Sequence, residues 1–327
     1  MTPAADRRSF LKKATLGGLA LTFFPAAESK RVGIIGLDTS HSVAFTKVLN
    51  AAEASPAYAG YKVTAAYPYG SRDIESSAKR IPGYIEEVKK LGVEVVESIA
   101  DLLRKVDVVL LETNDGRLHL EQALQVLKAG KRMFIDKPVA ASLADAAAIY
   151  KAAEKYRIPV FSASSLRYIK GIEAIDKASV MGADTFSPAV LEKTHPDLFW
   201  YGVHGVETLF TVMGRGCREV VRVHTDSTDV VIGTWEDGRI GTFRGTRTGV
   251  HDYGGTVFMK QKNQVLGPYA GYEPLLKDII RYFETGAVPV TPEETLEIFA
   301  FMEAADESKR LGGKPVSLKS RFDLLPR

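Results

Sequence analysis

The residues Gly36-Leu37-Asp38-Thr39-Ser40-His41 directly follow a short apolar segment at 32–36. In this setting the pattern Gly-x-Gly-x-x-Gly binds the pyrophosphate of a dinucleotide, because its glycines let the backbone approach the phosphates closely. Of the three glycines only Gly36 remains, and Asp38 and His41 replace the others. A carboxylate ~5 Å from a phosphate costs roughly 3 kcal/mol at an effective dielectric constant of about 20. The turn therefore predicts a weakened phosphate site.

Two interpretations of this turn stay open. In one, Asp38 turns away, for example to cap the following helix, and the hydroxyl groups of Thr39 and Ser40 bind the phosphates. In the other, Asp38, Ser40 and His41 bind something other than a nucleotide. A second polar segment, Tyr67-Pro68-Tyr69-Gly70-Ser71-Arg72, lacks the acidic residue that usually binds the ribose hydroxyls. Ser71 and Arg72 suit a 2′-phosphate, which favours NADP over NAD, although Arg72 is equally consistent with an exposed loop.

Short apolar strands alternate with helical segments through the first half of the chain, which predicts a doubly wound parallel sheet. Ligands of such sheets bind beyond the carboxyl ends of the strands. We therefore expect residues 38–41, 68–72, 113–114 and 136–138 to gather at one edge. The expected strands are 32–36, 61–67, 93–96, 107–112, 132–135 and 160–163, and the expected helices are 43–54, 84–91, 99–106, 117–129 and 143–156.

The second half has a different pattern. Strand-like segments dominate, and Asp237-Gly238 between two of them is a strong hairpin signal. Helices are expected at 274–284 and 292–310, so this half is an α+β domain with a largely antiparallel sheet. The expected strands are 220–225, 230–235, 240–246 and 255–260. The predicted division is 1–29 as a signal peptide, 30–160 as a Rossmann-type domain, and 161–327 as a substrate and oligomerisation domain.

Four segments in this order resemble the Gfo/Idh/MocA family of NAD(P)-dependent sugar and polyol oxidoreductases. They are the 32–36 strand with its turn, residues 114–131, Asp136-Lys137-Pro138 (the family's Glu-Lys-Pro), and Gly202-Val203-His204 through Glu207 (its Gly-x-His-x-x-Asp). The resemblance implies NADP or NAD as cofactor. The residues that it implies for cofactor binding, together with those of the two polar segments above, are Gly36, Thr39, Ser40, His41, Ser71, Arg72, Asn114, His119, Asp136 and Lys137.

The resemblance also implies that Lys137 lies near the nicotinamide and that His204 is the catalytic acid/base. Hydride transfer from an alcohol needs a base at the hydroxyl and a cation for the developing oxyanion, and these two residue types suit the roles. Some family members carry an acid four residues before the histidine, where this chain has Trp200. Glu207, one helical turn on, is better placed than Asp197 to orient His204. We expect Trp200, Tyr201 and Asp197 to shape the substrate pocket.

A metal site is not expected. Glu192, His195 and Asp197 lie close together in the sequence, but Pro196 indicates a loop and the spacing does not place the three side chains on one helix face. The single cysteine, Cys217, allows no intrachain disulfide and is more typical of a packed thiol than of a nucleophile.

The N-terminus is typical of an export signal. Arg7 and Arg8 precede Phe10-Leu11-Lys12 and an apolar stretch at 14–24, which is shorter than the roughly 20 residues that span a membrane. The paired arginines resemble the twin-arginine signal, so we expect an exported, periplasmic protein that uses the twin-arginine machinery. The net charge of +3, partly from this segment, gives no indication of nucleic-acid binding.

Together these features predict an exported NAD(P)-dependent oxidoreductase acting on a sugar, polyol or glycoside hydroxyl. A homo-oligomer is expected as well, through the exposed sheet of the second domain. Two alternatives remain open on the same fold. One is a lyase or hydratase without a dissociable nucleotide, whose site would include residues 38–41. The other is a carbohydrate-binding protein without turnover. The fold alone does not decide between them.

Overall fold

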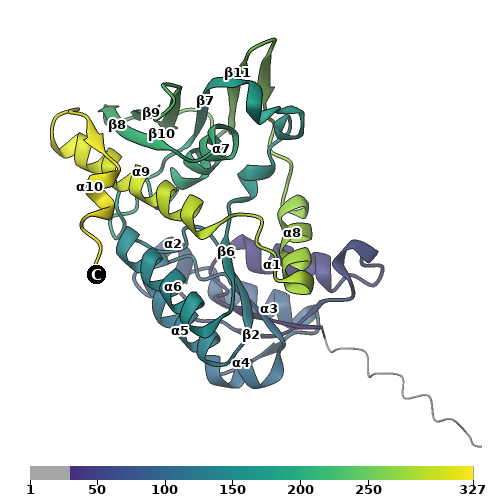
Figure 1. Cartoon of the computed structure of the whole chain (residues 1–327). Coiled ribbons are helices and arrows are strands. Elements are labelled where there is room, and N and C mark those ends of the chain that lie inside the picture. Colours follow the sequence, from purple (N-terminus) through teal and green to yellow (C-terminus); the bar gives the residue numbers. More distant parts are fainter. Residues whose placement is uncertain (1–29, 327) are drawn as a thin grey trace, which may run out of the picture.

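The computed structural model describes residues 30–326, so the expected signal at 1–29 lies outside the described residues. The chain forms two domains, each built on one sheet (Figure 1). The first sheet has six parallel strands in the order β3-β2-β1-β4-β5-β6, as the alternating pattern predicts. Its strands are β1 (Arg31–Ile35), β2 (Lys62–Tyr67), β3 (Glu94–Val95), β4 (Val108–Leu111), β5 (Arg132–Ile135) and β6 (Val160–Ser162). Because β6 ends at Ser162, this sheet extends past the predicted boundary at 160.

The helices of the first domain largely follow the prediction. One difference matters for the site: the first helix begins at Ser40, with Thr39 as its extended N-cap, instead of at Val43. Ser40 and His41 therefore belong to the first turn of this helix, where side chains point toward the strand ends. The helices are α1 (Ser40–Leu49), α2 (Glu75–Ala78), α3 (Ile81–Lys90), α4 (Ile99–Lys105), α5 (His119–Lys128) and α6 (Leu143–Tyr156).

The second sheet has seven strands in the order β12-β11-β7-β10-β9-β8-β13. It is antiparallel except where β7 pairs parallel with β10, and Asp237-Gly238 makes the predicted hairpin between β9 and β10. The strand β7, third in this order, was not expected from the sequence. The strands are β7 (Val180–Pro188), β8 (Cys217–His224), β9 (Thr228–Trp235), β10 (Ile240–Thr246), β11 (Gly254–Met259), β12 (Asn263–Leu266) and β13 (Val316–Ser317).

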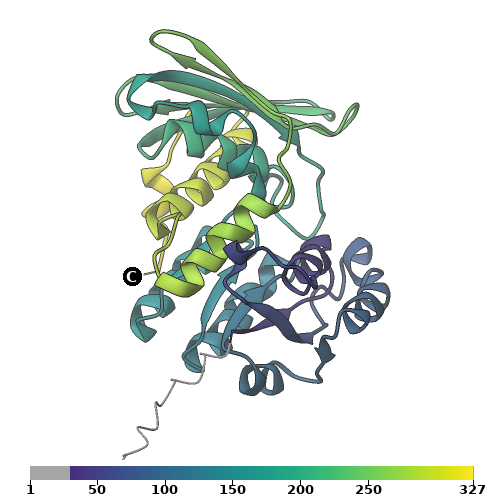
Figure 2. The ribbon, with the colours of Figure 1, turned by 90° about the vertical axis from the view of Figure 1, so that its right-hand side faces the viewer.

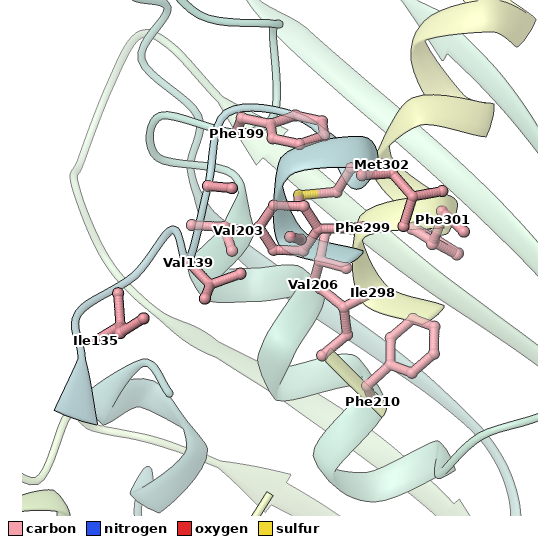
Figure 3. Close-up of a cluster of buried hydrophobic side chains, with 14 of the residues drawn as sticks. Ile135, Val139, Phe199, Val203, Val206, Phe210, Ile298, Phe299, Phe301 and Met302 are labelled. Carbon is pink, nitrogen blue, oxygen red and sulfur yellow. The ribbon is translucent and has the colours of Figure 1, made fainter. Parts of the chain in front are cut away.

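Helices α7 (Val203–Met213) and α9 (Pro292–Arg310) pack on one face of the second sheet (Figure 2). The short helix α10 (Lys319–Phe322) follows near the C-terminus. A buried cluster joins these helices to the end of β5 in the first domain, so it spans the domain junction (Figure 3). Its members include Ile135, Val139, Val203, Val206, Phe210, Ile298, Phe299 and Met302. Since Ile135 and Val139 flank Lys137 while Val203 precedes His204, this packing fixes the two predicted catalytic residues relative to each other.

Helix α8 (Glu273–Thr285) returns to the first domain. Its buried side chains, among them Leu275, Ile279 and Phe283, belong to the same apolar cluster as Val32 and Phe45. Figure 1 shows α8 beside α1, below the second sheet. The predicted division at 160–161 places α8 in the second domain, but its packing makes it part of the first. Within residues 30–326, no helix is long and apolar enough to cross a membrane.

Candidate active site

A polar cavity of about 230 Å³ opens between the two domains at the carboxyl edge of the first sheet. The strand order brings the ends of β1, β4 and β5 side by side, so the predicted gathering of polar segments at this edge is confirmed. The wall from the second domain is aromatic. The lining residues are Thr39, Ser40, His41, Ser76, Arg80, Asn114, Lys137, Ser165, Leu166, Trp200, Tyr201, His204, Tyr253, Tyr269 and Tyr272.

His204 and Lys137 share this cavity, although 67 residues separate them in the sequence. Both are nearly inaccessible to solvent, with 5% and 6% of their surface exposed. Burial lowers the pKa of His204 well below its ordinary value, and the positive charge of Lys137 lowers it further. The imidazole is therefore neutral at pH 7 and able to accept a proton.

Ser164 orients His204, a role that the sequence did not indicate. Its hydroxyl lies 2.6 Å from Nδ1 of His204, and its backbone N–H donates to Glu207 Oε2 at 2.9 Å. Glu207 thus acts on His204 through Ser164. The sequence had led us to expect a direct contact between Glu207 and the imidazole instead. Burial raises the pKa of Glu207 to about 7, although Arg167 opposes this shift. The arrangement leaves Nε2 of His204 as the nitrogen available to a bound molecule.

Asp38 turns away from the start of α1, but it does not cap the helix. Its carboxylate is fully buried and accepts hydrogen bonds from the backbone N–H groups of Ser71, at 2.7 Å, and Asn114, at 3.0 Å. Gly70 makes room for it, since a Cβ there would lie 2.5 Å from Asp38 Oδ2. Asp38 therefore ties together the ends of β1, β2 and β4, and each of its carboxylate oxygens has a backbone donor within the protein.

The phosphate-binding turn keeps features that fit a dinucleotide. Gly36 has φ of +92°, and a Cβ there would lie 2.5 Å from Thr113 N, so this position still requires glycine. Thr39 makes no side-chain cap, and both Thr39 and Ser40 line the cavity at the N-terminus of α1. Arg80 faces the same end. A helix N-terminus with hydroxyl groups and a guanidinium matches the needs of a phosphate, so the residues present fit the pyrophosphate.

The β2 side of this edge carries a separate cavity of about 410 Å³. Tyr67, Tyr69 and Arg72 line it, where an adenosine would lie in a Rossmann domain. Ser71 is buried beneath the Asp38 contact and lines neither cavity.

Two residues from the β4–α5 connection have different surroundings. Asn114 lines the cavity, and its side chain donates to Ser77 Oγ at 2.8 Å. His119 is fully buried, with its ring nitrogens at 2.6 Å from Thr113 O and 3.2 Å from Val139 O. His119 therefore links the loops that contain Thr113 and Val139 and does not line the cavity.

Of the predicted substrate residues, two reach the cavity and one does not. Trp200 and Tyr201 line it, and the Tyr201 ring lies 5.2 Å from that of His204. Asp197 instead forms ion pairs with Arg222, at 2.8 Å, and Lys309, at 2.6 Å. His195 faces Asp115, at 3.4 Å.

His41 lies on the cavity floor beside two buried carboxylates. Its Nδ1 is 2.7 Å from Asp136 Oδ2 and 4.0 Å from Glu112 Oε2. Burial raises the pKa of Glu112 well above its ordinary value, and the charge of Asp136 adds to the effect. Burial also opposes ionisation of Asp136, but His41 and Lys137 outweigh it and lower that pKa. Sequence reasoning noted His41 and Asp136, whereas Glu112 was only the end of an apolar strand.

Residues 30–164 match the family model GFO_IDH_MocA, described as an oxidoreductase family with an NAD-binding Rossmann fold. The first domain is a Gfo/Idh/MocA domain. The match confirms the resemblance for the three segments that lie within residues 30–164 and places this domain in an NAD-binding family; the fourth segment, 202–207, lies outside the matched residues. Comparison with curated proteins gave no match.

Solved structures extend the likeness to both domains. A putative NADPH-dependent oxidoreductase from Desulfitobacterium hafniense has a TM-score of 0.71 and 16% identity, covering 91% of this chain and 100% of its own. Scyllo-inositol dehydrogenase from Lactobacillus casei, solved with NAD(H) and scyllo-inositol, has a TM-score of 0.70 and 14% identity, covering 89% and 100%. A probable dehydrogenase from Thermotoga maritima has a TM-score of 0.71 and 19% identity, covering 89% and 99%. At these identities the likeness establishes the fold.

Proposed function

We propose that this chain is an NAD(P)-dependent oxidoreductase that acts on a hydroxyl group of a sugar, polyol or glycoside. One observation carries the proposal: His204 and Lys137, from different domains, line a single polar cavity with an aromatic wall. Membership of the first domain in an NAD-binding oxidoreductase family supports it, as do structural neighbours that include an inositol dehydrogenase.

In the proposed reaction a substrate hydroxyl lies between the two side chains. Neutral His204 accepts the hydroxyl proton through Nε2, while Ser164 holds the ring at Nδ1. The ammonium group of Lys137 stabilises the negative charge that develops on the oxygen. The nicotinamide, when bound, supplies the hydride acceptor. Thr39, Ser40 and Arg80 would hold its phosphates, and Arg72 would lie on the adenosine side.

The decisive experiment is nucleotide binding followed by turnover. The purified protein should bind NADP or NAD with micromolar affinity in a calorimetric titration and should oxidise members of a sugar and polyol panel. Arg72→Ala should weaken NADP more than NAD if Arg72 contacts a 2′-phosphate. No binding at millimolar concentration would contradict the proposal.

A second candidate is a lyase or hydratase that works without a dissociable nucleotide. The Asp38 contact favours it, because the bonds to Ser71 and Asn114 bridge the ends of β2 and β4 that a dinucleotide must cross. Turnover or binding of a hydroxylated substrate in protein free of nucleotide would support this candidate over the first.

We also propose export to the periplasm through the twin-arginine route, on the strength of Arg7-Arg8 and the apolar stretch after them. Replacing both arginines by lysine should retain the protein inside the cell in a fractionation experiment.

A homo-oligomer is proposed as well, because exposed apolar side chains such as Ile240 and Val265 lie on the second sheet. Light scattering after gel filtration tests it.

A further inference from the structure

Three side chains that can ligate a metal meet below the proposed active site. His41 is in the first turn of α1, Glu112 follows β4, and Asp136 follows β5. Because these elements adjoin in the sheet, the potential ligand atoms all lie within 4.8 Å of one another. The group thus comes from three separate segments and not from a local run of acidic residues.

The cluster is buried and incompletely bonded. Glu112 and Asp136 have no solvent exposure, and His41 has 6%. Neither carboxylate oxygen of Glu112 has a hydrogen-bond partner in the described part of the chain. Buried carboxylates normally have donors or a cation, because loss of hydration is otherwise uncompensated. Glu112 is therefore the feature of this cluster that needs an explanation.

A proton alone explains it poorly. A proton on one oxygen of Glu112 would remove the repulsion between the two acids, but it would leave the other carboxylate oxygen without a partner among the residues described. The His41 Nδ1 atom is 4.0 Å from Glu112 Oε2 and already lies beside Asp136. A cation between the three groups would instead give each of them a partner.

We propose that His41, Glu112 and Asp136 bind one divalent transition-metal ion. One imidazole nitrogen and two carboxylate oxygens suit Mn²⁺, Fe²⁺ or Zn²⁺, whereas Ca²⁺ and Mg²⁺ prefer oxygen ligands alone. Two carboxylates neutralise the charge of the ion, so the buried site has no net charge. Metal–ligand distances of about 2.0–2.2 Å place ligand atoms up to about 4.4 Å apart, close to the limit of 4.8 Å observed here.

The position of the site links it to the cavity. His41 is the one member of the cluster that lines the cavity, so the ion lies beneath its floor, next to Lys137. An open coordination position on the cavity side of the ion would take an oxygen atom of a hydroxylated substrate. The ligand class is therefore a small molecule with oxygen donors, such as a vicinal diol, bound through the ion. This inference does not depend on whether a nucleotide binds.

The test is metal binding by the full chain after treatment with a chelator. Equilibrium dialysis against Mn²⁺ or Zn²⁺, with metal analysis, should give one ion per chain with micromolar affinity or better. Glu112→Gln and His41→Gln should each weaken binding by about a hundredfold. His224→Ala and His251→Ala, which remove exposed imidazoles, should leave it unchanged. Unfolding temperatures measured with and without metal should rise in the parent protein and not in Glu112→Gln, since binding stabilises the folded state.

Absence of saturable binding up to millimolar metal would overturn the proposal. Stoichiometric binding that survives both Glu112→Gln and His41→Gln would also overturn it, because the ion would then lie elsewhere. If either variant fails to fold, Asp136→Asn replaces it. Substitution with Co²⁺ adds a spectroscopic readout: visible absorption that disappears in the variants would support the site without any measurement of activity or nucleotide.

Discussion

The active-site cavity and the Arg222 network are both buried and rich in ionisable groups, but only the second is fully paired. Arg222 is completely buried, and its guanidinium contacts Asp229 at 2.8 Å, Asp197 at 2.8 Å and Asp306. In the cavity, by contrast, Glu112 lacks a partner among the described residues, and His204 is held at one nitrogen with the other left open. The difference separates groups that stabilise the second domain from groups that are kept available for a ligand.

The largest expected effect is on turnover. His204→Ala and Lys137→Ala should each lower it by about two to four powers of ten, because they remove the base and the oxyanion stabiliser. The double variant should lose much less than the product of the two, since both act on one step. Lys128→Ala, on the exposed side of α5, is the control. Steady-state kinetics with the identified substrate measure these losses. If the double variant lost the full product of the two single losses, His204 and Lys137 would not act on one step.

Breaking the Arg222 network should cost stability instead. Arg222→Met removes the cation that three carboxylates share, although Lys309 still pairs with Asp197 and Arg247 with Asp229. We expect a loss of about 3–5 kcal/mol in the free energy of unfolding. Urea denaturation measures it. A loss below about 1 kcal/mol would show that the ion pairs of Arg222 contribute little to stability. Pairing would then not be what distinguishes this network from the cavity.

Ser164→Ala should have an intermediate effect on the cavity. His204 would lose the hydroxyl at Nδ1, so we expect turnover to fall about tenfold, with stability changed by about 1 kcal/mol. The pH profile of turnover should also move, because the hydroxyl contact affects the protonation of the imidazole. Ser179→Ala removes a half-buried hydroxyl that donates to Asp176 O away from the cavity, and it should leave turnover and its pH profile unchanged.

The pH dependence of stability provides a further test. Burial holds the pKa of Glu207 at about 7, above its ordinary value of 4.5, so the folded state binds this proton more tightly than the unfolded state. The resulting stabilisation is complete below pH 4.5 and is lost as the pH rises to about 7. In Glu207→Gln this part of the slope should disappear. An unchanged slope of unfolding free energy against pH would contradict the assignment.

The smallest effect is expected for Glu112→Gln in metal-free protein. An amide has nearly the shape of the carboxylate but no charge, so the variant should differ by less than about 1 kcal/mol or be more stable. A large loss in denaturant titrations would show that Glu112 has a structural partner, as the carboxylates around Arg222 do.

Much of the fold could be predicted because the spacing of apolar residues along the chain indicates which faces of its helices and strands are buried. The continuous apolar run at β4 and the amphipathic α5 indicate a doubly wound sheet without any tertiary information. The strand β7 was missed because its hydrophobicity does not follow its burial: Thr185 and Ser187 are buried, whereas Phe186 between them is exposed. Helix α8 was predicted as a helix, but periodicity does not say which domain it covers.

The site could be predicted only where a motif marked it. Lys137 and His204 stand in recognisable segments, so their shared cavity was expected. Ser164 was not, because its contact with His204 spans 40 residues and depends on how the two domains pack. The hydrogen-bond partners of Asp38 could likewise not be predicted. They are backbone amides of distant loops, and backbone groups have no signature in the sequence.

Helix α8 makes the order of synthesis differ from the order of burial. The first sheet is complete once Ser162 has been made, yet the helix that covers Val32 and Phe45 begins only at Glu273. During translation this apolar face of the first domain therefore stays exposed to water until most of the second domain has been synthesised. Residues 30–164 alone would keep that face open to water. The export route proposed above, if it accepts only folded chains, would have to wait until α8 has been made and has packed on the first domain.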